Sequence, residues 1–104
     1  MNPDSQIKHE SESHLLVVDD EKEILFFWEL LLKDMGYQVT AMQGGIAAYE
    51  WLSTHADEID AVITDMSMPK MTGLELAAKI KELAPSLPIA LCRLTSDYPK
   101  EHLQ

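Results

Sequence analysis

Three aspartates stand directly after short apolar runs, in positions where their carboxylates could hold a cation or accept a phosphoryl group. Asp19 and Asp20 follow the run at residues 15–18, and Asp65 follows the run at residues 61–64. If the two runs are neighbouring parallel strands, their carboxyl ends share one edge of a sheet, which is where open α/β sheets bind ligands. Because converging carboxylates repel one another unless a cation or a proton intervenes, the spacing predicts a cation site at this edge.

Oxygen ligands without sulfur or nitrogen favour Mg²⁺ at the predicted site. Proteins usually hold Mg²⁺ with one or two carboxylates and a phosphate, whereas zinc sites use histidine and cysteine, and neither accompanies the three aspartates. A carboxylate beside a divalent ion can attack phosphorus and form an aspartyl phosphate. Asp65 is the predicted nucleophile, because it stands alone at its strand end and precedes a turn, residues 66–69, whose backbone groups can reach a metal or a phosphate.

A structural role is the alternative for each aspartate taken singly. Aspartates after strands often cap the helix that follows, and Asp20 precedes a helical pattern. Three such residues at adjacent strand ends are harder to explain as three separate caps, so we favour the shared cation site.

The elements that would position these residues alternate between strands and helices. Short apolar and β-branched patterns predict four strands, at residues 15–18, 37–42, 61–64 and 89–92. The second strand alternates apolar and polar residues, as an edge strand with one wet face would. Apolar residues at three- and four-residue spacing predict three helices, at residues 21–35, 45–55 and 73–84. Gly36 is predicted to end the first helix and Thr72 to cap the last, and the alternation predicts an α/β fold with a doubly wound parallel sheet.

The first predicted helix is apolar nearly all round. Its main stripe, expected to face the sheet, contains Ile24, Phe27, Trp28, Leu31 and Met35. Four further apolar residues lie off this stripe: Leu25, Phe26, Leu30 and Leu32. Two interpretations remain open, because these residues either pack under loops and the N-terminal tail or form a surface for a partner.

Composition limits the classes of protein to which the chain can belong. With 104 residues, 46% of them hydrophobic, there is room for one domain, and the polar residues 1–13 predict a disordered tail. No apolar run approaches the roughly 20 residues that cross a bilayer. The net charge of −10 argues against direct binding to nucleic acid or an anionic membrane. A single cysteine, Cys92, fits a reducing compartment, so we expect a cytoplasmic protein.

Residues 15–21 (LLVVDDE), 60–69 (DAVITDMSMP) and 71–76 (MTGLEL) resemble the receiver domain of bacterial two-component response regulators. The resemblance implies a flavodoxin-like sheet with strand order 2-1-3-4. It implies that Asp65 accepts a phosphoryl group from a partner histidine kinase. It also implies that Asp19 and Asp20 hold Mg²⁺ together with Asp65, and that Ser67 supplies a backbone carbonyl to the ion.

The sequence departs from the receiver pattern in two places. Receivers carry a threonine or serine at the end of strand 4 that contacts the phosphoryl group; the register from Pro88 puts Arg93 there, with Thr95 as the alternative contact. Receivers also have a fifth strand, preceded by a lysine that binds the phosphoryl oxygens, and a fifth helix. Since the sequence stops at Gln104, we expect an incomplete receiver at residues 14–104 in which Arg93 partly fills the role of the lysine.

Three functions remain open on the sequence. The first is a signalling module, not an enzyme in the usual sense, in which phosphorylation of Asp65 shifts a conformational equilibrium. The second is a degenerate receiver that acts by protein association alone. The third is a Mg²⁺-dependent phosphohydrolase, which needs an acid two residues after the nucleophile, where this chain has Ser67. We also expect a homodimer, formed through the exposed edge of the strand at residues 89–92 or through exchanged elements.

Overall fold

Four parallel strands form one sheet in the computed structural model, which describes residues 13–93. In chain order they are β1 (His14–Asp19), β2 (Gln38–Gln43), β3 (Ala61–Asp65) and β4 (Ile89–Cys92). Their spatial order, β2-β1-β3-β4, confirms the predicted doubly wound α/β fold. The predicted strands agree with these bounds to within one residue at each end. Asp19 and Asp65 are therefore the last residues of their strands, not the first residues beyond them.

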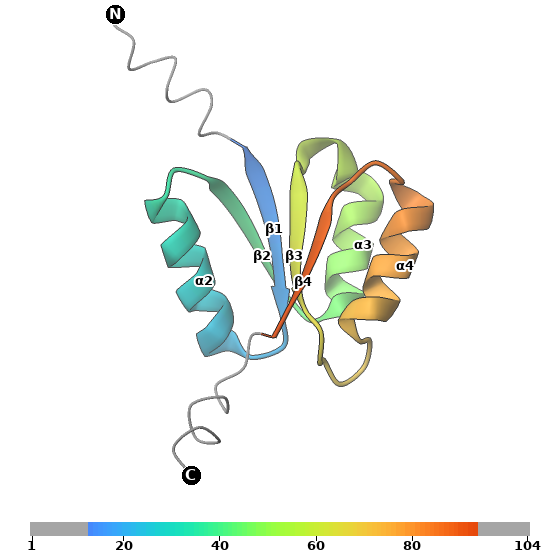
Figure 1. Ribbon diagram of the computed structural model, residues 1–104, viewed down its shortest axis with the longest axis horizontal. Helices are drawn as coiled ribbons and strands as arrows, with labels where there is room; N and C mark the ends of the chain where they lie inside the picture. Colours follow the sequence, from blue (N-terminus) through green and yellow to red (C-terminus); the bar gives the residue numbers. More distant parts are fainter. Residues whose placement is uncertain (1–12, 94–104) are drawn as a thin grey trace, which may run out of the picture.

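Three α-helices cover the sheet, as predicted. They are α2 (Lys22–Asp34), α3 (Gly45–His55) and α4 (Gly73–Leu83), and a short 3₁₀ helix, η1 (Ala56–Glu58), follows α3. Of the α-helices in residues 13–93, α2 lies alone on one face of the sheet, and α3 and α4 lie together on the other (Figure 1). The prediction of one wet face for β2 is wrong, because its four central residues are all half-buried. Helix α2 packs against this strand from one side and α3 from the other.

Alternate residues of β1 enter two separate cores. Leu15 and Val17 pack with Leu25 and Leu32 under α2. The alternating residues Leu16 and Val18 join the larger core beneath α3 and α4, whose other members include Leu52, Val62, Leu76 and Ile80. Because β1 is buried on both faces, packing from both sides fixes its register in the sheet, and with it the position of its last residue.

The predicted buried stripe of α2 is wrong for three of its five residues. Phe27, Leu31 and Met35 are exposed, whereas Leu25 and Leu32, expected off the stripe, are buried. The reason is that α2 packs mainly over β1 and β2, so one flank of the helix lies beside a face of β3 and β4 that no helix of residues 13–93 covers. Met35 and residues of β3 and β4 line a hollow of about 370 Å³ there.

Helix ends follow the predicted signals. Gly36, with φ 104°, ends the turn after α2. Thr72 caps α4 in a capping box: its side chain accepts a hydrogen bond from the Glu75 N–H, and the Glu75 carboxylate accepts one from the Thr72 N–H. Such paired caps fix where a helix begins, so the loop between β3 and α4 has a defined end.

Two predictions concern residues outside the described part of the chain. The disordered tail at residues 1–13 falls there except for its last residue, and so does Thr95. Among residues 13–93, no helix is long and apolar enough to cross a membrane.

Candidate metal centre

Three aspartates meet at the carboxyl edge of the sheet: two end adjacent strands, and the third directly follows one of them. Asp19 ends β1 and Asp65 ends β3, and the two strands pair in parallel with Val18 opposite Thr64. One carboxylate oxygen from each of Asp19, Asp20 and Asp65 lies within 4.8 Å of the other two. The predicted convergence is therefore confirmed, and it follows from the strand order, which makes β1 and β3 neighbours although they are far apart in the sequence.

Asp19 is the most buried member of this acidic cluster. Its exposed fraction is 0%, and its Oδ1 accepts a hydrogen bond of 2.9 Å from the Glu21 N–H. Within residues 13–93, its Oδ2 is buried without a hydrogen-bond partner. A buried carboxylate oxygen without a partner is costly, because desolvation is not offset by any bond. Either a proton or a cation at Oδ2 would offset this cost.

Burial raises the pKa of Asp19 from its ordinary 3.8 to about 6. This net shift in pKa already includes the opposing effect of the Glu21 N–H, which stabilises the carboxylate, and the raising effect of the negative charges of Asp65 and Asp20. A cation placed among the three carboxylates would reverse both unfavourable effects at once. The chemistry of the cluster therefore fits Mg²⁺, which takes oxygen ligands and tolerates partial burial.

Asp65 is also nearly buried, with an exposed fraction of 4%. Its Oδ1 accepts a hydrogen bond of 3.3 Å from the Ser67 N–H, so the turn after β3 bends back over the carboxylate. The backbone oxygen of Met66 accepts a bond from the Gly73 N–H, which closes the loop. A Cβ added at Gly73 would collide with the backbone oxygen of Asp65 and lie 2.9 Å from Met66 Cα, so this close approach requires glycine.

Asp20 is not a helix cap, so the structural alternative for this residue is wrong. The N-cap of α2 is Glu21, which makes no side-chain capping bond. Asp20 instead belongs to the two-residue link between β1 and α2, and its backbone oxygen accepts a hydrogen bond of 3.0 Å from Gln43 Nε2. Sequence reasoning missed Gln43. The signal lay in the register of two parallel strands, because β1 and β2 end side by side with Asp19 opposite Gln43.

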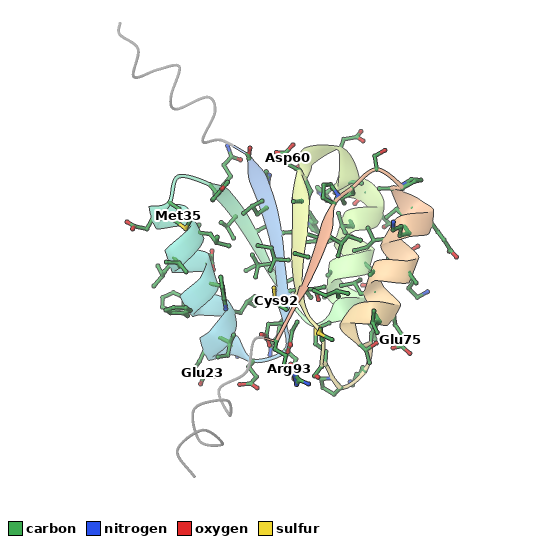
Figure 2. All side chains as sticks on the ribbon, in the orientation of Figure 1. Glu23, Met35, Asp60, Glu75, Cys92 and Arg93 are labelled. Carbon is green, nitrogen blue, oxygen red and sulfur yellow. The ribbon has the colours of Figure 1, made fainter. Side chains whose placement is uncertain are left out.

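Strand β4 brings Arg93 to the same edge of the sheet. Cys92 pairs with Asp65, and the Met66 N–H donates a hydrogen bond of 2.8 Å to the Cys92 carbonyl. Arg93 is the first residue beyond the strand and is exposed. Figure 2 shows Cys92 and Arg93 at the carboxyl ends of the strands, at the end of the sheet opposite Asp60. The register that predicts Arg93 at the end of strand 4 is thus confirmed.

Comparisons with known proteins converge on one family. A family model described as the response regulator receiver domain matches residues 15–102. The response regulator SaeR of Staphylococcus epidermidis is 37% identical over 76 residues, which cover 73% of this chain and 32% of that protein. The response regulator receiver protein CpdR of Brucella abortus is 35% identical over 75 residues, which cover 72% of this chain and 61% of that protein. The chain thus spans less than two thirds of either relative.

Solved structures agree with the sequence comparisons. The crystal structure of a response regulator receiver domain protein from Clostridium thermocellum superposes with a TM-score of 0.76 at 30% identity, over 88% of this chain and 72% of that one. The response regulator protein TrrA of Thermotoga maritima, solved in complex with Mg²⁺ and BeF, gives a TM-score of 0.72 at 31% identity, over 86% of this chain and 76% of that one.

Proposed function

Because the chain belongs to the response regulator receiver domain family, we propose that it is the phosphoacceptor module of a two-component signalling system. In this proposal a histidine kinase phosphorylates Asp65. The observation that carries it is the convergence of the Asp65 carboxylate with those of Asp19 and Asp20 within 4.8 Å. Receiver domains are signalling modules, not classical enzymes. The net charge of −10 and the single cysteine favour a cytoplasmic module that contacts neither nucleic acid nor membrane directly.

In the proposed reaction, a carboxylate oxygen of Asp65 attacks the phosphorus of a phosphohistidine. An O–P bond forms while the P–N bond breaks, and the histidine nitrogen leaves with the electron pair of that bond and can then take up a proton from solvent. The Ser67 N–H donates to Asp65 Oδ1. This bond holds one carboxylate oxygen while the other faces the phosphorus, so the turn after β3 orients the nucleophile.

Asp19, Asp20 and Asp65 are the proposed ligands of Mg²⁺, with the backbone carbonyl of Ser67 as a fourth. When bound, Mg²⁺ neutralises charge on the transferring phosphoryl oxygens. The unpartnered, buried Oδ2 of Asp19 supports this assignment. Arg93 at the end of β4 is the proposed cationic contact of the phosphoryl group, and Thr95 is the proposed hydroxyl contact.

Acetyl phosphate tests the phosphoacceptor proposal without the kinase. Incubation with Mg²⁺ should add the mass of one phosphoryl group, and Asp65→Asn should abolish the addition. Asp60→Asn is the matched control, because Asp60 lies at the opposite end of the sheet and its substitute retains an acceptor for the His14 N–H. Labelling that persists in Asp65→Asn, or that is absent from the unaltered chain, contradicts the proposal.

A second candidate function, association without phosphorylation, is favoured by a different observation. Strand β4 ends the sheet in residues 13–93, so its outer edge presents backbone groups with no strand partner there. Beside it lies a hollow between α2 and the face of β3 and β4 that no helix of residues 13–93 covers, lined by Met35, Ile63 and Ala90. Exposed strand edges and apolar faces favour pairing with another chain. A second copy supplies a matching edge and a matching face by two-fold symmetry, so the proposed assembly is a homodimer.

Sedimentation velocity distinguishes this candidate from a monomeric switch. The unaltered chain should sediment as a dimer in the absence of phosphate donors, and Ala90→Lys should shift it to a monomer, because a lysine on an edge strand blocks strand pairing. Leu74→Lys is the control, since Leu74 is 61% exposed on α4, on the other side of the sheet. A monomeric unaltered chain, or a dimer unaffected by Ala90→Lys, removes this candidate.

A further inference from the structure

The link between β1 and α2 carries the most exposed ligand of the acidic cluster. Asp20 is half-buried, whereas Asp19 and Asp65 are buried at the ends of strands. Mutual repulsion of the three carboxylates pushes the least constrained one toward solvent. Something must therefore oppose the movement of Asp20 if the cluster is to be ready for a cation.

The end of β2 holds this link at two successive carbonyls. The Gly44 N–H donates a hydrogen bond of 3.0 Å to the Asp19 carbonyl. The Gln43 side chain donates one of 3.0 Å to the Asp20 carbonyl. The first bond is made by backbone and survives any substitution that keeps the fold. The second depends on a side-chain amide, and only the nitrogen of that amide can donate to a carbonyl oxygen.

We propose that Gln43 is a positioning residue of the metal centre, whose amide holds the Asp20 backbone so that the Asp20 carboxylate stays among the ligands of the cation. This inference rests on the proposed function, because it takes the acidic cluster to be a Mg²⁺ site. Gln43 itself is not a ligand: it acts through Asp20. Its role is preorganisation, since a ligand already in place loses less freedom when the ion binds.

Mg²⁺ and Ca²⁺ respond differently to a misplaced ligand. Mg²⁺ demands near-ideal octahedral geometry, whereas Ca²⁺ accepts irregular shells of six to eight oxygens. Loss of a positioning bond should therefore weaken Mg²⁺ binding more than Ca²⁺ binding. A loss of net charge or of general stability would weaken both to the same degree.

Gln43→Met isolates the bond, because methionine has a similar length and no donor. We expect the dissociation constant for Mg²⁺ to rise about five-fold, the usual effect of one lost hydrogen bond, while that for Ca²⁺ changes by less than about two-fold. Both constants come from titrations followed by the backbone amide signals of Asp20, Glu21 and Asp65 in ¹H–¹⁵N NMR spectra. Gln43→Ala is the second variant and should behave in the same way.

Gln38→Met is the matched control. Gln38 begins the same strand, is exposed, and lies at the opposite end of the sheet from the acidic cluster. It should leave both dissociation constants unchanged, and the melting temperatures of all three variants in metal-free buffer should agree with that of the unaltered chain.

The outcomes distinguish failure of the proposed metal site from failure of the positioning role of Gln43. If the unaltered chain shows no Mg²⁺-dependent shift at Asp20 and Asp65, the proposed metal site fails, and the role of Gln43 fails with it. If the unaltered chain binds Mg²⁺ and Gln43→Met binds it equally well, only the positioning role fails. An equal loss of Mg²⁺ and Ca²⁺ affinity also overturns that role.

Discussion

The carboxylates of Asp19 and Asp65 lie within 4.8 Å of each other at the ends of two paired parallel strands. Both side chains are almost completely withdrawn from solvent. The fold therefore buries two like charges next to each other in the metal-free protein. This arrangement should make the free energy of unfolding depend on pH.

Metal-free protein should lose stability as the pH rises through 6. The pKa of Asp19 is about 6 in the folded chain and 3.8 ordinarily, so folding favours the protonated form. This contribution is complete below pH 3.8 and is lost progressively as the pH rises from 3.8 through 6, up to a total of about 3 kcal/mol of unfolding free energy. Urea denaturation in EDTA at a series of pH values measures it.

Asp19→Asn is the comparison for this pH dependence, because asparagine keeps an acceptor for the Glu21 N–H and does not titrate. The difference in unfolding free energy between the two chains should widen in favour of the variant from pH 4 to pH 7. Saturating Mg²⁺ should narrow it again. A difference that stays constant over this interval contradicts the raised pKa.

Gly73→Ala should be far more damaging than Gly45→Ala. A Cβ at position 73 meets the backbone of Asp65 and Met66, which cannot move without displacing the end of β3. A Cβ at position 45 meets the side chain of Met71, at 3.0 Å from Sδ and 3.1 Å from Cβ, and no backbone atom is among these contacts. We expect a loss of about 3 kcal/mol or more at position 73 and about 1 kcal/mol or less at position 45, measured by urea denaturation. Equal losses would show that the loop after β3 can relax.

Local signals in the sequence were sufficient for most of the fold. Apolar runs identified the strands, and Thr72 marked the start of α4, because caps and runs depend on neighbouring residues. The acidic cluster was also predictable, since parallel strands end at one edge. The resemblance to receiver domains supplied the strand order that brings β1 beside β3.

Features that depend on which elements touch were not predictable in the same way. Helix α2 is apolar nearly all round, so its spacing did not reveal that Leu25 and Leu32 face the sheet while Phe27 and Met35 do not. Its orientation is decided by packing on β1 and β2. Gln43 was missed for a related reason. Its hydrogen bond to Asp20 joins residues 23 positions apart through a strand pairing, and no sequence pattern near either residue indicates it.

Two substitutions on α2 should differ in how much unfolding free energy they remove, because one replaces an exposed apolar side chain and the other a buried one. Phe26 is 62% exposed, so Phe26→Ser should change the unfolding free energy of the monomer by less than about 1 kcal/mol. Leu32 is 6% exposed in the core under α2, so Leu32→Ala should cost about 3 kcal/mol. Denaturation at low protein concentration measures both. A large loss for Phe26→Ser would mean that this side chain packs within its own chain.

Arg93 directly follows Cys92, the residue of β4 that pairs with Asp65, and it carries a positive charge. Arg93→Ala should slow the labelling of Asp65 by acetyl phosphate about three-fold at low salt, since an exposed guanidinium attracts a phosphate dianion. At 1 M salt the difference should nearly vanish, because the Debye length falls to about 3 Å. Arg93→Lys, which keeps the charge, should lose less than Arg93→Ala. Lys81→Ala removes an exposed charge from α4 and should have no effect. If Arg93→Ala labels at the unaltered rate in low salt, Arg93 makes no contact with the phosphoryl group.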